Sequence, residues 1–455
     1  MARVTAFDAV VIGGGFAGLS AAARLARRGA RVAVLEARSR LGGRATAFAD
    51  RDTGELVDNG QHVLLGCYRA TFEFLREIGA EGNVRLQPQL RATMIDRAGV
   101  VSRLECPMLP APLHLLAGVM DWSALAWRDR LAVLRMSTPL RLAVRQFRRS
   151  ERSADGNGPI AASPGETVES WLIRNGQTPR LRELLWDPLA LAALNQSPVE
   201  AAAPVFARVL AEMFSGDARA AALALPTKPL HLMYAEPART FIEQRGGVVR
   251  TGVAARLRMD GGAIVVRAGD DVITAPSVVS SVPWFAFGDL FDEPPAELAD
   301  VLRLARATAS CPIVTVNLWF DRPIMSEQFV GLPGRVMQWV FDKRDVFVGG
   351  ARHLSLVSSG AEDVVRKTND ELVAIAHHEL IDSMASVRDA ALVRATVVRE
   401  PRATFSLAPG QPRRPTTRTP IKGFYLAGDW IDTGLPATIE SAVRSGHLAA
   451  DLITR

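Results

Sequence analysis

Cysteine is scarce in this sequence, and its spacing argues against two kinds of protein. The 455 residues contain three cysteines, Cys67, Cys106 and Cys311. They are odd in number, far apart, and never form a Cys-x-x-Cys pair, which argues against a disulfide framework and against a zinc site. We therefore expect a protein of a reducing compartment that binds no metal.

Long apolar runs are also lacking. The longest candidate, residues 109–120, is too short to cross a bilayer and contains His114 and two prolines. Residues 6–15 have the pattern of a folded strand followed by glycines, and not that of an export signal. The length and the 48% hydrophobic content are typical of a globular protein of two or three domains. We therefore expect a cytoplasmic protein.

Excess charge is confined to one stretch of the chain. The net charge is +6, and residues 128–152 alone hold eight arginines against Asp129 and Glu151, an excess of the same size. The arginines of this stretch are Arg128, Arg130, Arg135, Arg141, Arg145, Arg148, Arg149 and Arg152. The rest of the protein is therefore close to neutral.

The arginine-rich stretch has two interpretations. A helix after Pro139 would carry its arginines on one side and Leu140, Val144 and Phe147 on the other. It is either a solvated helix packed on the core or an amphipathic helix lying on an anionic membrane surface. Nucleic acid is not an expected partner, because no aromatic interleaving or nucleic-acid motif accompanies the arginines.

A glycine turn near the N-terminus lies between an apolar strand and a helix. Gly13-x-Gly15-x-x-Gly18 follows the strand at 9–12, and a second strand ends at Glu36. This context, with an acidic residue about twenty positions on, is that of a dinucleotide-binding fold. The glycines permit the tight turn, the approach of a pyrophosphate and close helix packing, while the helix N-terminus attracts phosphate. Glu36 would accept from ribose hydroxyls, which disfavours NADP.

The residues after the second strand point to a particular cofactor. Arg40, Gly42, Gly43 and Arg44 lie in "RSRLGGRA", which resembles the signature that follows the dinucleotide fold in the flavin amine oxidase and carotenoid desaturase superfamily. Paired glycines let the chain pass close to a cofactor, and an arginine brings positive charge toward its phosphates. The resemblance implies that the cofactor is FAD.

A similar strand-to-helix turn closes the chain. The strand "FYLAG" leads into Gly428-Asp429, and Pro436 opens a helix that we expect over 437–452. FAD is too long for one loop, so this second turn would hold its ribityl and isoalloxazine end. Asp429 would accept from ribityl hydroxyls or a bridging water, and the positive end of the helix would stabilise the anionic reduced flavin.

These motifs and the resemblance together define the residues expected to contact FAD. The segment after residue 58 should pass near the flavin, and a backbone group near Val253 should meet the adenine. The full set is Gly13, Gly15, Phe16, Ala17, Gly18, Glu36, Ala37, Arg38, Gly42, Gly43, Arg44, Gly60, Gln61, His62, Val253, Gly428, Asp429, Pro436, Ala437, Thr438 and Ile439.

If both ends of the chain build one nucleotide domain, the substrate part must be inserted between them. We expect an α/β protein with α+β inserts, in which a Rossmann-like FAD-binding domain is interleaved with a substrate-binding domain as in flavin amine oxidases. The FAD-binding domain would take residues 1–85, 221–285 and 395–455. The substrate-binding domain would take 86–220 and 286–394, with possible membrane-docking helices at 104–150.

Four stretches of the chain resemble a smaller group within this superfamily. These are "VDNGQHVLLGCYRATFEFLREIG", "PLALAALN", "RATFSLAPGQPRRP" and "YLAGDWIDTGLPATIESAVRSG". They resemble the squalene-associated FAD-dependent desaturases, which are hydroxysqualene dehydroxylases of bacterial hopanoid synthesis, and the resemblance spans essentially the whole chain. It implies a C30 isoprenoid substrate and a reductive reaction, in which hydride from reduced FAD replaces an allylic hydroxyl that leaves as water.

Such a reaction needs an apolar pocket and a proton donor. The apolar helical stretch at 187–214 is expected to line the pocket, with Leu191, Leu194 and Asn195 as the substrate-facing residues. Asp58 and His62 are the predicted catalytic residues, because their segment should lie beside the flavin. The alternatives are that Asp58 orders a loop and that His62 binds the cofactor.

Other functions stay open on the sequence alone. They are a carotenoid or phytoene desaturase-like dehydrogenase, an amine oxidase, and a non-catalytic lipid carrier that retains FAD. No counterpart of the active-site lysine of many amine oxidases is evident, and the chain has only three tyrosines. The electron donor stays unidentified, since there is no second dinucleotide fingerprint. A lipid substrate favours a peripheral location on the inner face of the cell membrane.

Overall fold

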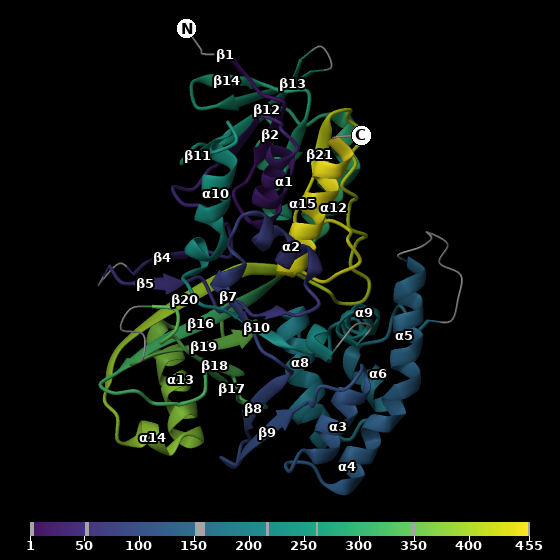
Figure 1. The fold of residues 1–455 in the computed structure, drawn as a ribbon, viewed down its shortest axis with the longest axis vertical. Coiled ribbons are helices and arrows are strands. Elements are labelled where there is room, and N and C mark those ends of the chain that lie inside the picture. The colour runs from purple at the N-terminus through teal and green to yellow at the C-terminus, as the bar shows by residue number, and fades with distance from the viewer. Residues whose placement is uncertain are drawn as a thin grey trace.

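A computed structural model describes residues 4–50, 54–150, 160–214, 218–260, 263–347 and 352–453. Helices and sheets are mixed along the chain, which confirms the predicted α/β fold (Figure 1). The N- and C-terminal elements lie together at one end of the molecule in Figure 1, and the inserted segments form the other end.

The nucleotide part is built on a five-stranded parallel sheet that draws on three distant segments. Its strand order is β11 (Val248–Thr251), β3 (Val32–Glu36), β2 (Ala9–Ile12), β15 (Val278–Ser280) and β21 (Phe424–Leu426). Strands β2, β3 and β15 are buried throughout, which explains why their sequences are continuous apolar runs. The two strand-to-helix units recognised at the chain ends therefore belong to one sheet.

Helices α1 (Phe16–Arg27) and α15 (Ile439–Ile453) follow β2 and β21 and pack closely together. A Cβ atom at Gly446 would lie 2.3 Å from the Ala17 carbonyl oxygen and 2.4 Å from Ser20 Oγ, so this approach requires glycine. Because parallel strands end at the same sheet edge, the N-termini of both helices lie at that edge.

The start of α15 differs slightly from the prediction. The helix begins at Ile439 and not at residue 437. The Thr438 hydroxyl accepts a hydrogen bond from the Ser441 amide at 3.2 Å, and so caps the helix at this later position.

The second large element is a seven-stranded sheet. Its strand order is β20 (Leu392–Phe405), β16 (Ser310–Phe320), β19 (His353–Ser359), β18 (Trp339–Asp342), β17 (Phe329–Gly331), β8 (Arg91–Ile95) and β9 (Val101–Glu105). Alternate residues of β16 pack in one cluster with α13 (Asn369–Ser383), among them Val314, Val316 and Leu318. The residues between them lie on the opposite face, where Thr315 Oγ1 is 3.5 Å from the position of a Cβ on Gly60. One face of the sheet is therefore apolar, and the other borders the segment that contains Gly60.

Two predicted domain boundaries fall inside strands. Residue 395 lies within β20, which pairs with β16 to both sides of that point, so residues 395–405 continue the seven-stranded sheet. Residue 85 lies within β7 (Val84–Leu86), which pairs with β10 (Leu223–Pro226). The division into an FAD-binding and a substrate-binding domain stays a prediction, but its limits cannot be drawn at these two residues without cutting paired strands.

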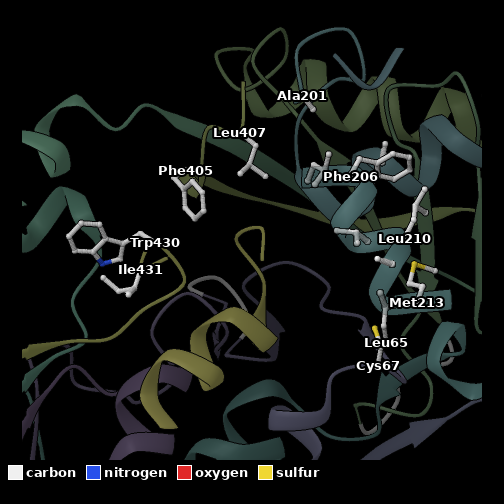
Figure 2. Packing of buried hydrophobic residues seen from close by; sticks show 14 of the residues in the cluster. Leu65, Cys67, Ala201, Phe206, Leu210, Met213, Phe405, Leu407, Trp430 and Ile431 are labelled. Carbon is white, nitrogen blue, oxygen red and sulfur yellow. The ribbon is translucent and has the colours of Figure 1, made fainter. Parts of the chain in front are cut away.

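A helical block flanks the seven-stranded sheet. It contains α3 (Leu113–Asp121), α4 (Trp127–Ala132), α5 (Ser137–Ser150), α6 (Val168–Arg174), α8 (Asp187–Leu194) and α9 (Ala203–Phe214). The predicted single apolar stretch at 187–214 is two helices, because Asn195 takes the left-handed conformation with φ of 50° and ends α8. Figure 2 shows Met213 of α9 beside Leu65 and Cys67, so the block packs against the segment that follows the first turn.

Smaller elements complete the architecture. A four-stranded sheet joins β1 (Val4–Ala6), β14 (Asp271–Thr274), β13 (Ala263–Ala268) and β12 (Ala255–Asp260). The other short elements are β4 (Ala47–Ala49), β5 (Leu56–Asp58), β6 (Leu64–Leu65), α2 (Arg69–Glu77), α7 (Pro179–Leu181), α10 (Glu236–Glu243), α11 (Trp284–Phe287), α12 (Ala299–Ala307) and α14 (Ala385–Arg388).

Three features expected from composition can be examined in the described residues. Cys67, Cys106 and Cys311 are all free and buried. Among these residues no helix is both long enough and apolar enough to span a bilayer. In the same part of the chain, no three His, Cys, Asp or Glu side chains gather in a way that could hold a metal ion.

The contact between α1 and α15 generates a prediction about stability. Gly446→Ala places a methyl group against backbone atoms of α1, so the helices must separate. We expect a loss of about 1–3 kcal/mol in the free energy of unfolding, as is usual for overpacking. Urea unfolding followed by circular dichroism measures this loss. Gly82→Ala is the matched control, since a Cβ there meets nothing within 4 Å. Equal stability of the two variants would contradict the proposed role of Gly446.

Candidate active site

The first glycine turn leaves backbone donors free at the start of α1. Gly13 has φ of 110°, and a Cβ on Gly18 would lie 2.0 Å from the Gly13 carbonyl oxygen, so both positions require glycine. Gly15 caps α1 without a side-chain hydrogen bond, and no acidic side chain occupies the first turn. The first amides of α1, including those of Ala17 and Gly18, are therefore suited to a phosphate.

Glu36 is held in place beside this turn. Its carboxylate is buried and accepts hydrogen bonds from the Gly14 amide at 2.7 Å and the Arg38 amide at 2.8 Å. The Val253 amide donates to the Glu36 carbonyl oxygen at 2.9 Å. The structure thus brings Glu36, Ala37, Arg38 and Val253 together at the end of β3, where the prediction placed the adenosine part of the cofactor.

The paired glycines lie opposite the first turn. A Cβ on Gly43 would lie 3.3 Å from the Gly15 Cα atom, so the two backbones approach closely. The Tyr234 hydroxyl donates to the Gly42 carbonyl oxygen at 2.8 Å, and its ring stacks on Phe16 with centroids 3.5 Å apart. The Phe16 side chain is therefore part of the core, and its backbone amide is the group left for a cofactor.

An ion pair joins the paired-glycine segment to the second turn. Arg44 Nη2 lies 2.5 Å from Asp429 Oδ1, although the two residues are 385 positions apart, and Arg44 Nη1 donates to the Ala403 carbonyl oxygen at 2.7 Å. Gly428 has φ of 138°, and its amide donates to Ser445 Oγ at 2.7 Å. The Arg44 side chain thus points toward Asp429, whereas the sequence analysis expected it to point toward the cofactor phosphates.

The arrangement fits a dinucleotide as long as FAD. The uncapped start of α1 and the buried Glu36 carboxylate form one end of the site. Asp429 and the residues that precede α15, from Pro436 to Ile439, form the other end at the same sheet edge. Both ends therefore offer the donor and acceptor groups that the two halves of such a cofactor require.

A buried ion pair lies at the predicted catalytic segment. Asp58 Oδ2 is 2.7 Å from Lys343 Nζ, and Asp58 Oδ1 accepts from the Leu230 amide at 3.1 Å. Lys343 Nζ also donates to Gln61 Oε1 at 2.7 Å, and the lysine is only 1% exposed. An ammonium group so deeply buried requires such partners, so the three side chains form one unit.

The sequence analysis did not predict Lys343 as a site residue, and it identified no counterpart of the active-site lysine of many amine oxidases. The only signal was its rarity: the chain has four lysines, and Lys343 directly follows the apolar strand β18. The other three, Lys228, Lys367 and Lys422, are not buried. Lys343 is 285 residues from Asp58, so only the tertiary structure could pair them.

His62 lies in the same segment, but its protonation state does not favour acid catalysis. Its Nδ1 atom is 3.3 Å from the Gly60 carbonyl oxygen. Burial lowers the pKa of His62, and the nearby Asp58 carboxylate opposes this shift only in part, while Lys343 and Arg44 add to it. The imidazole is therefore neutral at neutral pH, which is the weaker proton donor of its two forms.

The seven-stranded sheet presents polar residues beside this segment. Thr315 Oγ1 lies 3.5 Å from the position of a Cβ on Gly60. On the same face, His353 Nε2 is 2.9 Å from Asn317 Oδ1, and the His353 ring stacks on Trp319 with centroids 4.1 Å apart. Burial lowers the pKa of His353 to about 2, so it stays neutral. This side of the site is therefore polar, whereas the predicted substrate pocket was expected to be apolar.

The residues predicted for the substrate pocket are mostly packed into the protein. The Asn195 amide nitrogen donates to Thr404 Oγ1 at 2.9 Å, and its oxygen accepts from the Gly360 amide at 2.8 Å, so the side chain links three segments. Leu194 is buried in the core, and Leu191 lies against Gly360. Their contact with a substrate stays a prediction.

Two cavities of the described structure bear on the site. One of about 30 Å³ is beside the start of α15, and its lining comes from Leu65, Cys67, Tyr68, Ala193, Val209, Glu212, Leu435, Pro436, Thr438 and Glu440. Ala193 of α8 lines this cavity, whereas the predicted pocket residues Leu191 and Leu194 do not. A larger pocket of about 440 Å³ lies on the surface between α2 and α10 and contains none of the predicted site residues.

Comparison with known proteins agrees with this geometry. The family model of flavin-containing amine oxidoreductases matches residues 16–454. A hydroxysqualene dehydroxylase of Rhodopseudomonas palustris is 32% identical over 97% of both chains, and that of Zymomonas mobilis is 27% identical over 97% of this chain and 98% of its own. A 15-cis-phytoene desaturase of Solanum lycopersicum is 26% identical and covers 98% of this chain and 78% of its own.

Solved structures agree on the fold. An oxidoreductase from Methanosarcina mazei superposes with a TM-score of 0.73 at 18% identity and covers 98% of this chain and 100% of its own. Wild-type putrescine oxidase bound to putrescine gives a TM-score of 0.70 at 17% identity, with 100% of both chains covered. The nucleotide turns, the matched family and the related enzymes agree: this chain belongs to the flavin-containing amine oxidoreductase family, as an FAD-dependent oxidoreductase related to the hydroxysqualene dehydroxylases.

Proposed function

We propose that this enzyme reduces hydroxysqualene to squalene in squalene and hopanoid synthesis. The observation that carries the proposal is the end-to-end similarity to hydroxysqualene dehydroxylases, which covers 97% of this chain in relatives from three bacteria. The four motifs that suggested this group are spread across the same length. A C30 isoprenoid alcohol is therefore the proposed substrate.

The reaction divides the work between cofactor and protein. FAD, when bound and reduced, supplies the hydride. The allylic carbon gains this hydride as its C–O bond breaks, and the departing oxygen takes up a proton and leaves as water. The protein must therefore bind the cofactor, exclude bulk water and hold a proton near the hydroxyl oxygen.

We place the proton donor at Lys343, with Asp58 and Gln61 as its positioning residues. The contacts at 2.7 Å to both partners use two of the three ammonium hydrogens, and Nζ also lies 5.1 Å from the centre of the Phe347 ring. We propose that the third hydrogen is the one offered to the substrate. A chain of contacts links this group to the second turn: Asn59 Nδ2 donates to the Arg44 carbonyl oxygen at 2.9 Å, and Arg44 pairs with Asp429. His62, being neutral, is better suited to bind the cofactor.

One alternative deserves a direct test because related sequences support it. The 15-cis-phytoene desaturases match 98% of this chain at 26% identity, and their name implies removal of hydrogen from an isoprenoid. The two functions differ in the direction of electron flow, since a desaturase reduces its flavin and the proposed enzyme reoxidises it. An amine oxidase has weaker support, because the similar solved amine oxidases establish the fold alone.

A lipid substrate also has consequences for location. We propose that the enzyme works as a peripheral protein on the inner face of the cell membrane, where such an alcohol would be dissolved. The enzyme also requires an electron donor. We propose that the reductant either enters through the same cleft as the substrate or arrives on a separate carrier.

The first prediction concerns electron flow. Mixing the reduced enzyme with hydroxysqualene under anaerobic conditions should reoxidise the flavin and form one squalene per flavin, because the alcohol is the electron acceptor. Absorbance follows the flavin, and mass spectrometry identifies the extracted lipid. Squalene is the matched control and should leave the flavin reduced. If the flavin stays reduced and the alcohol is unchanged, the proposal fails, and phytoene offered to the oxidised enzyme then tests the desaturase alternative.

The second prediction concerns the proton donor. Lys343→Met should slow this flavin reoxidation by about 10²- to 10⁴-fold, the usual contribution of a positioned acid. The control at an exposed lysine, Lys422→Met, should react like the unchanged enzyme.

Loss of Lys343 alone leaves Asp58 buried and unpaired, which costs about 3–5 kcal/mol of stability. The double variant Lys343→Met with Asp58→Asn removes both charges and should retain FAD while remaining slow. Rapid flavin reoxidation by the double variant would contradict the role of Lys343. Slow reoxidation by His62→Gln together with rapid reoxidation by Lys343→Met would do the same, and either result would indicate His62 as the proton donor.

A further inference from the structure

Several large apolar side chains are exposed on and beside α3 and α4, two contacting helices of the helical block. Of the 16 large hydrophobic residues exposed in the described part of the chain, six lie between positions 108 and 134, each 40–62% exposed. We call these six residues the apolar tip: Met108, Leu109, Leu113, Trp127, Leu131 and Leu134. A concentration of this kind on a soluble surface marks an interaction site.

The apolar tip is built on packed helices and not on a loose loop. The Arg130 guanidinium donates to the carbonyl oxygens of Met120 at 2.7 Å and Leu125 at 3.0 Å, which ties α4 to the end of α3. The inner faces of the two helices bury Leu115 of α3 and Ala132 of α4. In Figure 1, α3 and α4 lie at the end of the molecule farthest from the nucleotide sheet. The exposed side chains are therefore an outward surface that remains after the core is complete.

The surroundings of the tip are strongly basic. Within residues 104–149, the exposed acidic residues are Glu105 and Asp121. The exposed arginines of the same range are Arg128, Arg135, Arg141, Arg145, Arg148 and Arg149. Arg152, part of the same basic stretch in the sequence, lies outside the described residues. Apolar residues flanked by arginines complement the acyl and headgroup layers of an anionic bilayer.

The structure changes which helix would enter the lipid. The apolar side of α5, with Leu140, Ala143 and Phe147, is buried and packs with α9, where Arg208 lies 4.1 Å from the centre of the Phe147 ring. It is therefore unavailable to a membrane, and the interpretation of α5 as a helix lying flat in the interface is wrong. Its arginines remain exposed along the helix, which begins next to the tip at Ser137.

We propose that the apolar tip inserts into the interface of an anionic lipid bilayer while the neighbouring arginines bind its headgroups. The choice of a bilayer over a protein partner rests on the proposed lipid substrate and on the charge of the flank. The tip positions the helical block, which also lines the cavity beside α15 through Ala193 and Val209, against the phase that holds the substrate. Apolar insertion supplies affinity, and the arginines make it depend on anionic lipid.

The test uses the full-length holoenzyme and vesicles without substrate. Wild-type protein should sediment with vesicles of equal phosphatidylglycerol and phosphatidylcholine, and its tryptophan emission should shift to shorter wavelength as Trp127 leaves water. The combined change Leu113→Ser, Trp127→Ser and Leu131→Ser should lower vesicle affinity at least tenfold. The matched control, Val199→Ser with Val393→Ser, removes apolar residues that are 59% and 67% exposed elsewhere and should bind like wild type.

The arginines are tested separately. Arg141→Glu, Arg145→Glu and Arg148→Glu together should weaken binding to the anionic vesicles at least tenfold, and added salt should weaken wild-type binding, since headgroup attraction is screened. Vesicles of phosphatidylcholine alone should show a smaller difference between this variant and wild type. Equal binding of the variant and wild type to anionic vesicles would overturn the role of the arginines.

Activity on detergent-solubilised hydroxysqualene separates this inference from the proposed function. A tip variant that loses vesicle binding but keeps detergent-phase activity supports membrane docking. A wild-type enzyme that is active in detergent but never binds vesicles overturns docking and leaves the function intact. If the tip variant binds vesicles normally and instead loses self-association on size-exclusion chromatography, the surface is a protein interface and the proposal is wrong.

Discussion

A cofactor longer than any single loop imposes the constraint on which this structure depends. FAD needs one strand-to-helix turn for its adenosine and phosphates and a second for its flavin end. In this chain the two turns come from opposite ends of the sequence, so β2, β15 and β21 must lie side by side in one parallel sheet. The ion pair between Arg44 and Asp429 joins the second turn to the paired-glycine segment, which packs against the first turn. Gly446 lets the helices that follow them approach, which keeps both helix N-termini at one sheet edge.

The inserted segments follow from the same constraint. The chain must leave the nucleotide sheet after the first turn and return to it before the last strand, and it builds the seven-stranded sheet in between. That sheet buries one face against α13 and directs the other toward the segment that contains Asp58. Lys343 reaches Asp58 and Gln61 from this sheet, and burial makes the partners mutually dependent. The nucleotide fold thus supplies the cofactor site, and the insert supplies a buried ammonium group, which is the proton donor of the proposed reaction.

The helical block connects this chemistry to the character of the substrate. Its inner helices pack beside the start of α15, and its outer helices expose apolar and basic residues at the far end of the molecule. The proposed substrate is a water-insoluble alcohol and the proposed reaction must exclude water, and both favour an enzyme that works against a lipid phase. Binding, chemistry and surface composition are therefore consistent with one another across elements that are distant in the chain.

Local patterns in the sequence determined the family, the cofactor and the elements that hold it. The glycine turns, the acidic residue at the end of β3 and the final Gly-Asp turn each act through backbone geometry within a few residues, which is why motif spacing could identify them. Tertiary structure alone decided which distant side chains meet. It paired Lys343 with Asp58, stacked Tyr234 on Phe16, used Asn195 to link three segments and turned the apolar side of α5 inward. Periodicity records which face of a helix or strand is apolar, but the partner of that face depends on contacts across hundreds of residues, and no local pattern contains them.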